Sequence, residues 1–165
     1  MSLLRSFAAL LVLVIAPLAW AAVAPDFTLR DINSKSVSLS ELRKNNKIVL
    51  VNFWATWCNP CQVEMPHLQA LHAELGSQGL AVVGIATDDA RSSSMVKPLV
   101  YSKKLSYPVL LDTQSSVVSL YNPNKVLPFT VLINSAGEMV YSHSGYNAGD
   151  EVELRTKVLA ALGTP

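Results

Sequence analysis

Cysteine is scarce in this sequence: only two occur among 165 residues, so a small fold stapled by several disulfides is excluded. Charge is also sparse and nearly balanced, since charged residues make up 15% of the chain and the formal net charge is +1. That balance argues against a nucleic-acid-binding surface and against an acidic tail. The sequence contains no glycine-rich phosphate loop and no serine hydrolase motif. Its length fits one domain that is large enough to bury an apolar core.

The first 21 residues have the pattern of a secretory signal peptide. Arg5 is followed by a stretch without charge from residue 6 to residue 25. Residues 19–21, Ala-Trp-Ala, match the small-residue motif that signal peptidase cuts. We therefore expect cleavage after this motif and export across the inner membrane to the periplasm. An uncleaved leader that anchors the protein in the membrane is the alternative, because the apolar run is near the shortest length that spans a bilayer.

Downstream of the leader, residues 25–163 are predicted to form one domain in which strands and helices alternate. Short apolar or alternating runs predict strands at 27–29, 37–39, 48–53, 80–86, 109–111, 129–133 and 138–142. Helical patterns lie between and after them, at 40–44, 59–76, 91–105, 113–121 and 151–162. The first two strands are expected to form an N-terminal hairpin, and Ser40 is expected to cap the helix that follows. This order predicts an α/β fold with a mixed sheet covered on both faces.

The two cysteines form a Cys-x-x-Cys pair, Cys58 and Cys61, between a buried strand and a helix. A thiolate is the reactive form of cysteine, and free N–H groups at a helix N-terminus stabilise negative charge. The spacing places Cys61 on the same helix face, one turn further in. Cys58 is therefore predicted to attack a partner's disulfide, and Cys61 to resolve the mixed disulfide. We expect this redox-active disulfide to work without a cofactor or metal, with Trp57 as an exposed aromatic rim for docking partners.

Three structural interpretations of the pair carry less weight. A purely structural disulfide is disfavoured, because closing so short a loop adds only about 2 kcal/mol. A zinc site needs two more good ligands, and the three histidines form no second paired motif. Two inert buried thiols would not need a place between a strand and a helix. Redox exchange fits both the motif and its context.

The sequence at 51–61, Val-Asn-Phe-Trp-Ala-Thr-Trp-Cys-Asn-Pro-Cys, followed by Glu64 and Pro66, resembles the TlpA/ResA-like thiol–disulfide oxidoreductases. Weaker matches are the opening Ala-Pro-Asp-Phe at 24–27 and Leu-Pro-Phe-Thr at 127–130. The resemblance covers nearly the whole predicted domain. It implies a thioredoxin-like fold with an added N-terminal hairpin and a central insertion.

The resemblance also implies roles for residues around the pair. Leu127 and Pro128 match the cis-proline element that lies beside the disulfide, where the backbone can pair with an extended partner segment. Glu64 matches a glutamate near the active site, where a half-buried carboxylate would exchange protons with Cys61. A solvated glutamate on the helix surface is the alternative. Asn52 takes the place of the buried aspartate of cytoplasmic thioredoxins, and an amide cannot act as an acid or base.

Three functions compete. The family resemblance favours a reductase of periplasmic disulfides, with cysteine-containing clients such as apocytochrome c and a membrane thiol carrier as electron donor. The second is a peroxiredoxin-type peroxide reductase, because that group shares the Ala-Pro-Asp-Phe opening. The third is a copper-binding or chaperone module that uses Cys58, Cys61 and a histidine. A monomer is the default expectation for this fold class.

Overall fold

The computed structural model describes residues 22–163, and the predicted leader at 1–21 lies outside the described residues. The strands are β1 (Thr28–Arg30), β2 (Ser36–Ser38), β3 (Ile48–Trp54), β4 (Leu80–Ala86), β5 (Val109–Leu111), β6 (Phe129–Asn134) and β7 (Met139–Ser144). The helices are α1 (Leu39–Asn45), α2 (Asn59–Leu75), α3 (Val96–Ser102), α4 (Ser116–Tyr121) and α5 (Asp150–Leu162), with short 3-10 turns η1 (Gly76–Gln78) and η2 (Ser93–Met95). No helix in this part of the chain is long and apolar enough to cross a membrane.

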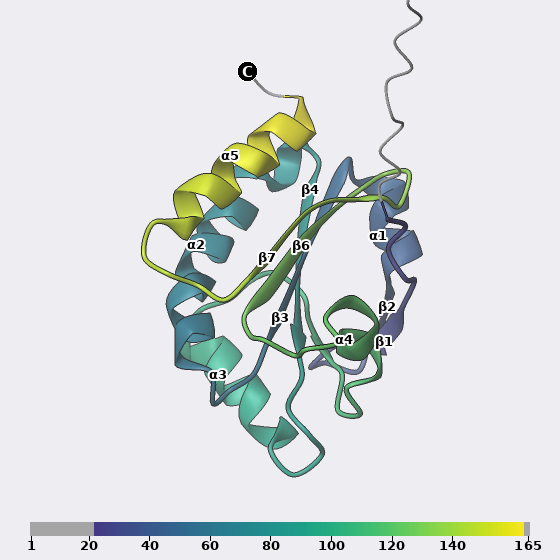
Figure 1. The fold of residues 1–165 in the computed structure, drawn as a ribbon. Coiled ribbons are helices and arrows are strands. Elements are labelled where there is room, and N and C mark those ends of the chain that lie inside the picture. The colour runs from purple at the N-terminus through teal and green to yellow at the C-terminus, as the bar shows by residue number, and fades with distance from the viewer. Residues whose placement is uncertain (1–21, 164–165) are drawn as a thin grey trace, which may run out of the picture.

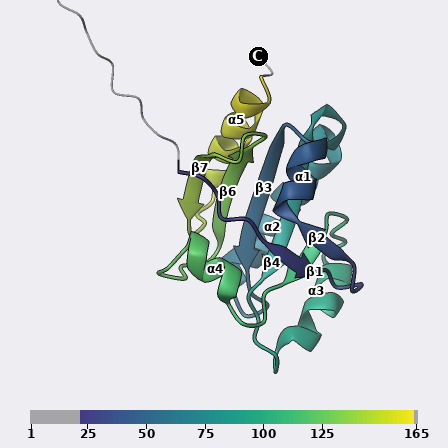
Figure 2. The ribbon, with the colours of Figure 1, turned by 90° about the vertical axis from the view of Figure 1, so that its right-hand side faces the viewer.

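A five-stranded mixed sheet forms the centre of the domain, in the order β5-β4-β3-β6-β7. Strands β3, β4 and β5 run parallel, whereas β6 pairs antiparallel with β3 and β7. Helices α2, α3 and α5 lie on one side of the sheet, and α1 and α4 lie on the other (Figure 1 and Figure 2). The separate hairpin of β1 and β2 lies on the α1 side. The predicted α/β fold, with a mixed sheet between helices and an N-terminal hairpin, is confirmed.

Two local predictions were wrong. Ser38, not Ser40, caps α1: its backbone is extended, and its Oγ accepts a hydrogen bond from the N–H of Glu41 at 3.2 Å. The helix predicted at 91–105 is a short 3-10 turn followed by the shorter helix α3. Pro98 explains the later start, because a proline fits the first turn of a helix but breaks a hydrogen bond further in.

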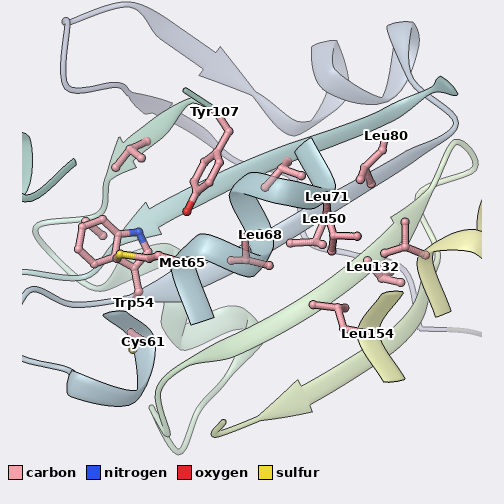
Figure 3. Packing of buried hydrophobic residues seen from close by; sticks show 14 of the residues in the cluster. Leu50, Trp54, Cys61, Met65, Leu68, Leu71, Leu80, Tyr107, Leu132 and Leu154 are labelled. Carbon is pink, nitrogen blue, oxygen red and sulfur yellow. The ribbon is translucent and has the colours of Figure 1, made fainter. Parts of the chain in front are cut away.

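Side chains of the sheet alternate between two apolar clusters, one on each face. On the α2 side, Leu50 and Trp54 of β3 belong to a cluster with Met65 of α2 and Leu154 of α5. Figure 3 shows Trp54, Cys61 and Met65 at one end of this cluster and Leu154 towards the other. The reactive pair is therefore built into the end of a packed core.

The cluster on the α1 side takes the alternate residues of the same strands. Val51 and Phe53 of β3 belong to it, with Leu39 of α1 and Val118 and Tyr121 of α4. The ring of Phe53 lies 5.3 Å from the ring of Tyr121, centre to centre. This cluster contains no cysteine.

Gly84 of β4 allows aromatic side chains to lie directly on the sheet at the end of the cluster that holds Cys61. A Cβ at this position would lie 2.9 Å from Nε1 of Trp54 and 3.2 Å from Cε2 of Tyr107. The first contact is closer than packed atoms tolerate and the second is tighter than most, so a larger residue would displace Trp54 and press on Tyr107. Trp54 lies at the same end of the cluster as Cys61 (Figure 3).

Candidate active site

Strand β3 leads into the reactive pair through the loop 55–57. Cys58 is the N-cap of α2, and Pro60 lies in its first turn, where a proline's missing N–H breaks no helical hydrogen bond. Cys58 and Cys61 form a disulfide with an S–S distance of 2.03 Å and a Cα–Cα distance of 5.3 Å. The chain thus forms the strand–motif–helix arrangement that the sequence predicts.

The surroundings of Cys58 favour a negatively charged sulfur. The backbone N–H of Cys61 donates to Sγ of Cys58 at 3.2 Å, in the first turn of a 17-residue helix. Free N–H groups and the helix dipole both stabilise a thiolate at this position. Cys58 is 5% exposed and Cys61 only 1%. The neighbouring Trp57 is 69% exposed.

Glu64 lies one turn after Cys61 on α2 and is buried, with 4% exposure, rather than solvated. Nδ2 of Asn52 donates to Glu64 Oε2 at 2.8 Å, and the hydroxyl of Thr130 donates to Oε1 at 3.1 Å. Nδ2 of Asn52 also donates to Oγ1 of Thr130 at 2.9 Å. Glu64, Asn52 and Thr130 therefore form a closed triangle of hydrogen bonds, called here the Glu64 cluster.

Burial makes the Glu64 carboxyl a weaker acid than an exposed glutamate. It raises the pKa of Glu64 to about 7, because a carboxylate removed from water is disfavoured. The hydrogen bonds from Thr130 and Asn52, and the charge of His143, offset part of this rise. A group with a pKa near neutrality can both take up and release a proton at physiological pH.

Asp88, which is 1% exposed, holds the loop that precedes Cys58. Its carboxylate accepts hydrogen bonds from the backbone N–H of Thr56, at 3.0 Å, and from the Thr56 hydroxyl. Nε2 of Gln62 donates to the carbonyl of Thr56 at 2.8 Å. The loop that carries Trp57 is therefore tied both to the end of β4 and to α2. No local pattern in the sequence identifies this role of Asp88, because Thr56 is 32 residues away along the chain.

Leu127 and Pro128 lie immediately before β6, and the peptide bond between them is cis. Leu127 is half-buried and packs against the apolar cluster that contains both cysteines. Pro128 is buried, and its carbonyl accepts a hydrogen bond from the N–H of Gly145 at 2.7 Å. The structure thus places Leu127 against the same apolar cluster as Cys58 and Cys61, and against the cluster on the α1 side as well.

An apolar groove opens beside Trp57, between the motif loop and α3. Its cavity measures about 400 Å³ and is lined by Thr56, Trp57, Met95, Pro98, Leu99 and Ser102. Met95 is 59% exposed, so the groove presents two large exposed apolar side chains, those of Trp57 and Met95. Within residues 22–163, no group of three or more His, Cys, Asp or Glu side chains is arranged to hold a metal ion.

Comparison with known proteins identifies the family. Residues 21–142 match the model of the AhpC/TSA family. The chain belongs to the AhpC/TSA family. The matched range includes the cysteine pair, the Glu64 cluster and the cis-proline element.

Curated relatives place the chain more narrowly within the AhpC/TSA family. It is 36% identical over 122 residues to the thiol-disulfide oxidoreductase ResA of Halalkalibacterium halodurans, a match that covers 74% of this chain and 66% of that protein. It is 33% identical to ResA of Geobacillus kaustophilus, covering 79% of this chain and 72% of that protein. The chain therefore spans roughly two thirds of these relatives' length and belongs with the ResA-like thiol–disulfide oxidoreductases.

A solved structure gives the same answer for the fold. The chain resembles a crystal structure from Chlorobium tepidum, described as a DsbE-type thiol:disulfide interchange protein, with a TM-score of 0.79 at 28% identity. The match covers 87% of this chain and 97% of the other. The thioredoxin-like fold, the TlpA/ResA-like family and the class of enzyme predicted from the sequence are thereby confirmed.

Proposed function

We propose that the protein is an exported reductase of disulfides in client proteins, acting by dithiol exchange at Cys58 and Cys61. The observation that carries this proposal is the Cys58–Cys61 disulfide at the N-terminus of α2, directly behind the exposed Trp57. A single pair of thiols that closes on itself suits two-electron exchange with another protein.

In the proposed reaction the reduced enzyme donates two electrons to the client. The Cys58 thiolate attacks one sulfur of the client disulfide, a mixed disulfide forms, and the other client sulfur leaves as a thiolate. Cys61 gives its proton to Glu64 and attacks Sγ of Cys58. The bond between Cys58 and the client sulfur that it attacked then breaks, that sulfur leaves as a thiolate, and the Cys58–Cys61 disulfide forms. Glu64 then releases the Cys61 proton to one client thiolate, and water protonates the other, so the client ends with two thiols, the enzyme with a disulfide, and two electrons have passed from the enzyme to the client.

The surroundings of the pair support specific roles in client binding. The exposed Trp57 and the apolar groove beside it offer contact area next to the attacking sulfur. Leu127 and Pro128 lie immediately before β6, and in this proposal the Leu127 backbone pairs with an extended client segment. In this proposal Glu64 is the acid and base for Cys61, since its pKa of about 7 suits transfer in both directions.

The wider setting of the proposal comes from the leader and the family. We propose that residues 1–21 direct export to the periplasm and are removed, or else remain as a membrane anchor. Clients are then cysteine-containing exported proteins such as apocytochrome c, in a role like that of cytochrome c maturation. A membrane thiol carrier would return electrons, and the enzyme would act as a monomer.

The experiment that tests this function compares residues 22–165 with the variants Cys58→Ser and Cys61→Ser. We expect Cys58→Ser to abolish insulin reduction, and Cys61→Ser to accumulate mixed disulfides that non-reducing gels resolve. Equilibration in thiol–disulfide buffers should give a potential near thioredoxin's, roughly −270 mV or lower. Full insulin reduction by Cys58→Ser would refute the mechanism. A potential near roughly −120 mV would reverse the direction, and peroxide consumption at a comparable rate would favour the peroxidase alternative.

A further inference from the structure

Thr130 occupies a polar row that crosses the central sheet beneath α2. In the strand register, Asn52 of β3 pairs with Thr130 of β6, and Thr130 pairs with His143 of β7. Directly paired residues on neighbouring antiparallel strands point to the same face and lie within contact distance. The rest of that face is apolar, since Leu50, Trp54 and Leu132 flank the row. A polar row inside an apolar layer costs stability unless its groups are bonded.

The Glu64 cluster is arranged for an ionised carboxylate. Both oxygens of Glu64 accept hydrogen bonds, one from Asn52 and one from Thr130. The two hydrogens of the Asn52 amide are used by Glu64 and by Thr130, at 2.8 and 2.9 Å. Every donor in the triangle therefore already points at an acceptor, and Oγ1 of Thr130, which accepts one hydrogen bond from Asn52, keeps a second acceptor position.

Thr130 is the group in the triangle that can reverse its role by rotation about one bond. A hydroxyl both donates and accepts, and its hydrogen turns to suit its partners, whereas an amide nitrogen only donates. When a proton reaches Oε1 of Glu64, the new O–H group can donate to Oγ1 of Thr130 at the same 3.1 Å contact. The Thr130 hydrogen must then turn away from Glu64.

We propose that Thr130 is a positioning residue that sets the proton affinity of Glu64 and, through Glu64, the pH at which Cys61 becomes reactive. Donation from Thr130 stabilises the carboxylate, so Glu64 is ready to accept the Cys61 proton during resolution. Reorientation of the same hydroxyl then accommodates the protonated acid. This role deepens the proposed function, because it rests on Glu64 acting for Cys61.

Other charged and titratable groups also act on Glu64. His143 of β7 lowers the pKa of Glu64 by its charge, and Asp150 at the start of α5 raises it. His143 Nε2 and Asp150 Oδ2 lie 3.1 Å apart, so the two charges partly cancel. The groups that feel the charge of Glu64 in turn are Tyr107, Tyr141 and Tyr146. None of these groups hydrogen-bonds to Glu64 in the described chain, whereas Thr130 and Asn52 do.

The test compares Thr130→Val, which keeps the shape and strand preference but removes the hydroxyl, with Thr130→Ser, which keeps the hydroxyl. The pKa of Glu64 is measured from its carboxyl carbon resonance as pH is varied, in protein with labelled glutamate. We expect Thr130→Val to raise this pKa by roughly one unit, because a hydrogen bond to the charged form is lost. Thr130→Ser should titrate near the wild-type value.

The pH profile of insulin reduction provides the second readout. Thr130→Val should move the profile to higher pH, and this shift should vanish in the Glu64→Gln background if Thr130 acts through Glu64. An unchanged Glu64 pKa in Thr130→Val, or equal shifts in the Val and Ser variants, would overturn the proposal. If Thr130→Val does not fold, Thr130→Ala removes the same donor without added bulk. The pKa of Glu64 is read from a resonance and does not depend on catalysis. The effect of Thr130 on this pKa can therefore be measured even if the protein proves not to be a reductase.

Discussion

The two faces of the central sheet are built from the same strands but serve different purposes. On β3, Phe53 points into the apolar cluster of the α1 side, whereas its neighbour Asn52 points towards α2 and bonds to Glu64. On β6, Val131 and Thr130 divide in the same way. The α1 face is a closed hydrophobic layer, and the α2 face carries a buried carboxyl, an amide, a hydroxyl and the disulfide.

This difference shows how one small domain combines stability with chemistry. Burial of apolar surface stabilises a fold, whereas burial of a carboxyl destabilises it even when hydrogen bonds are made. The polar groups are gathered in one place: Glu64 lies one helical turn after Cys61, and its partners Asn52 and Thr130 are paired with each other on β3 and β6. Helix α2 carries Cys61 and Glu64, with Cys58 at its N-cap. Only the part of the sheet that faces Glu64, at Asn52 and Thr130, therefore departs from apolar packing.

Phe53→Ala tests the stabilising face and should cause the largest loss of stability. Phe53 is fully buried, with rings of Tyr121 and Phe129 at 5.3 and 6.1 Å. We expect a loss of about 3–5 kcal/mol in the free energy of unfolding, from lost burial plus the cavity left behind. Urea unfolding measures it, with Phe53→Leu as the milder control. The reduction potential of the pair should not move; a changed potential would mean that the two faces are coupled.

Burial of the Glu64 carboxyl should make the free energy of unfolding depend on pH in a defined direction. The unfolded chain releases the Glu64 proton near pH 4.5, but the folded protein holds it until about pH 7. The folded state therefore binds more protons between these values, and its stability falls as pH rises through this window. The loss contributed by Glu64 should total about 3 kcal/mol.

Unfolding in urea at several pH values measures this cost. Glu64→Gln cannot ionise, so the difference in free energy of unfolding between this variant and the wild type should shift in favour of the variant as pH rises from 4.5 to about 7. Glu74→Gln is the matched control, because Glu74 lies on the same helix, is exposed, and pairs with Arg155 at 2.6 Å. A parallel pH dependence of wild type and Glu64→Gln would show that the carboxyl is not buried in solution.

The sequence predicts the parts of this comparison that depend on local pattern. The apolar run of β3, the Cys58–Cys61 motif at the start of α2 and the hairpin all follow from spacing along the chain. The Glu64 cluster depends on which strands pair and in what register, since Asn52 and Thr130 are 78 residues apart. Nothing local distinguishes Thr130 from other threonines in strands. Asn52 could be recognised as polar in a buried run, but not as the donor to Glu64.

Trp57→Ala should cause the smallest change in stability and so separates the docking surface from the core. Trp57 is 69% exposed, and substitutions at such positions change the free energy of unfolding by at most about 0.5 kcal/mol. Its contribution should appear instead in client recognition, since an aromatic side chain at the centre of an interface often accounts for roughly tenfold in affinity. We expect the kcat/KM for a protein disulfide to fall about tenfold, through a higher KM, while reduction of a small disulfide such as hydroxyethyl disulfide is unchanged. Equal losses on both substrates would mean that Trp57 affects Cys58 itself, and the α2 face would then have no surface devoted to docking alone.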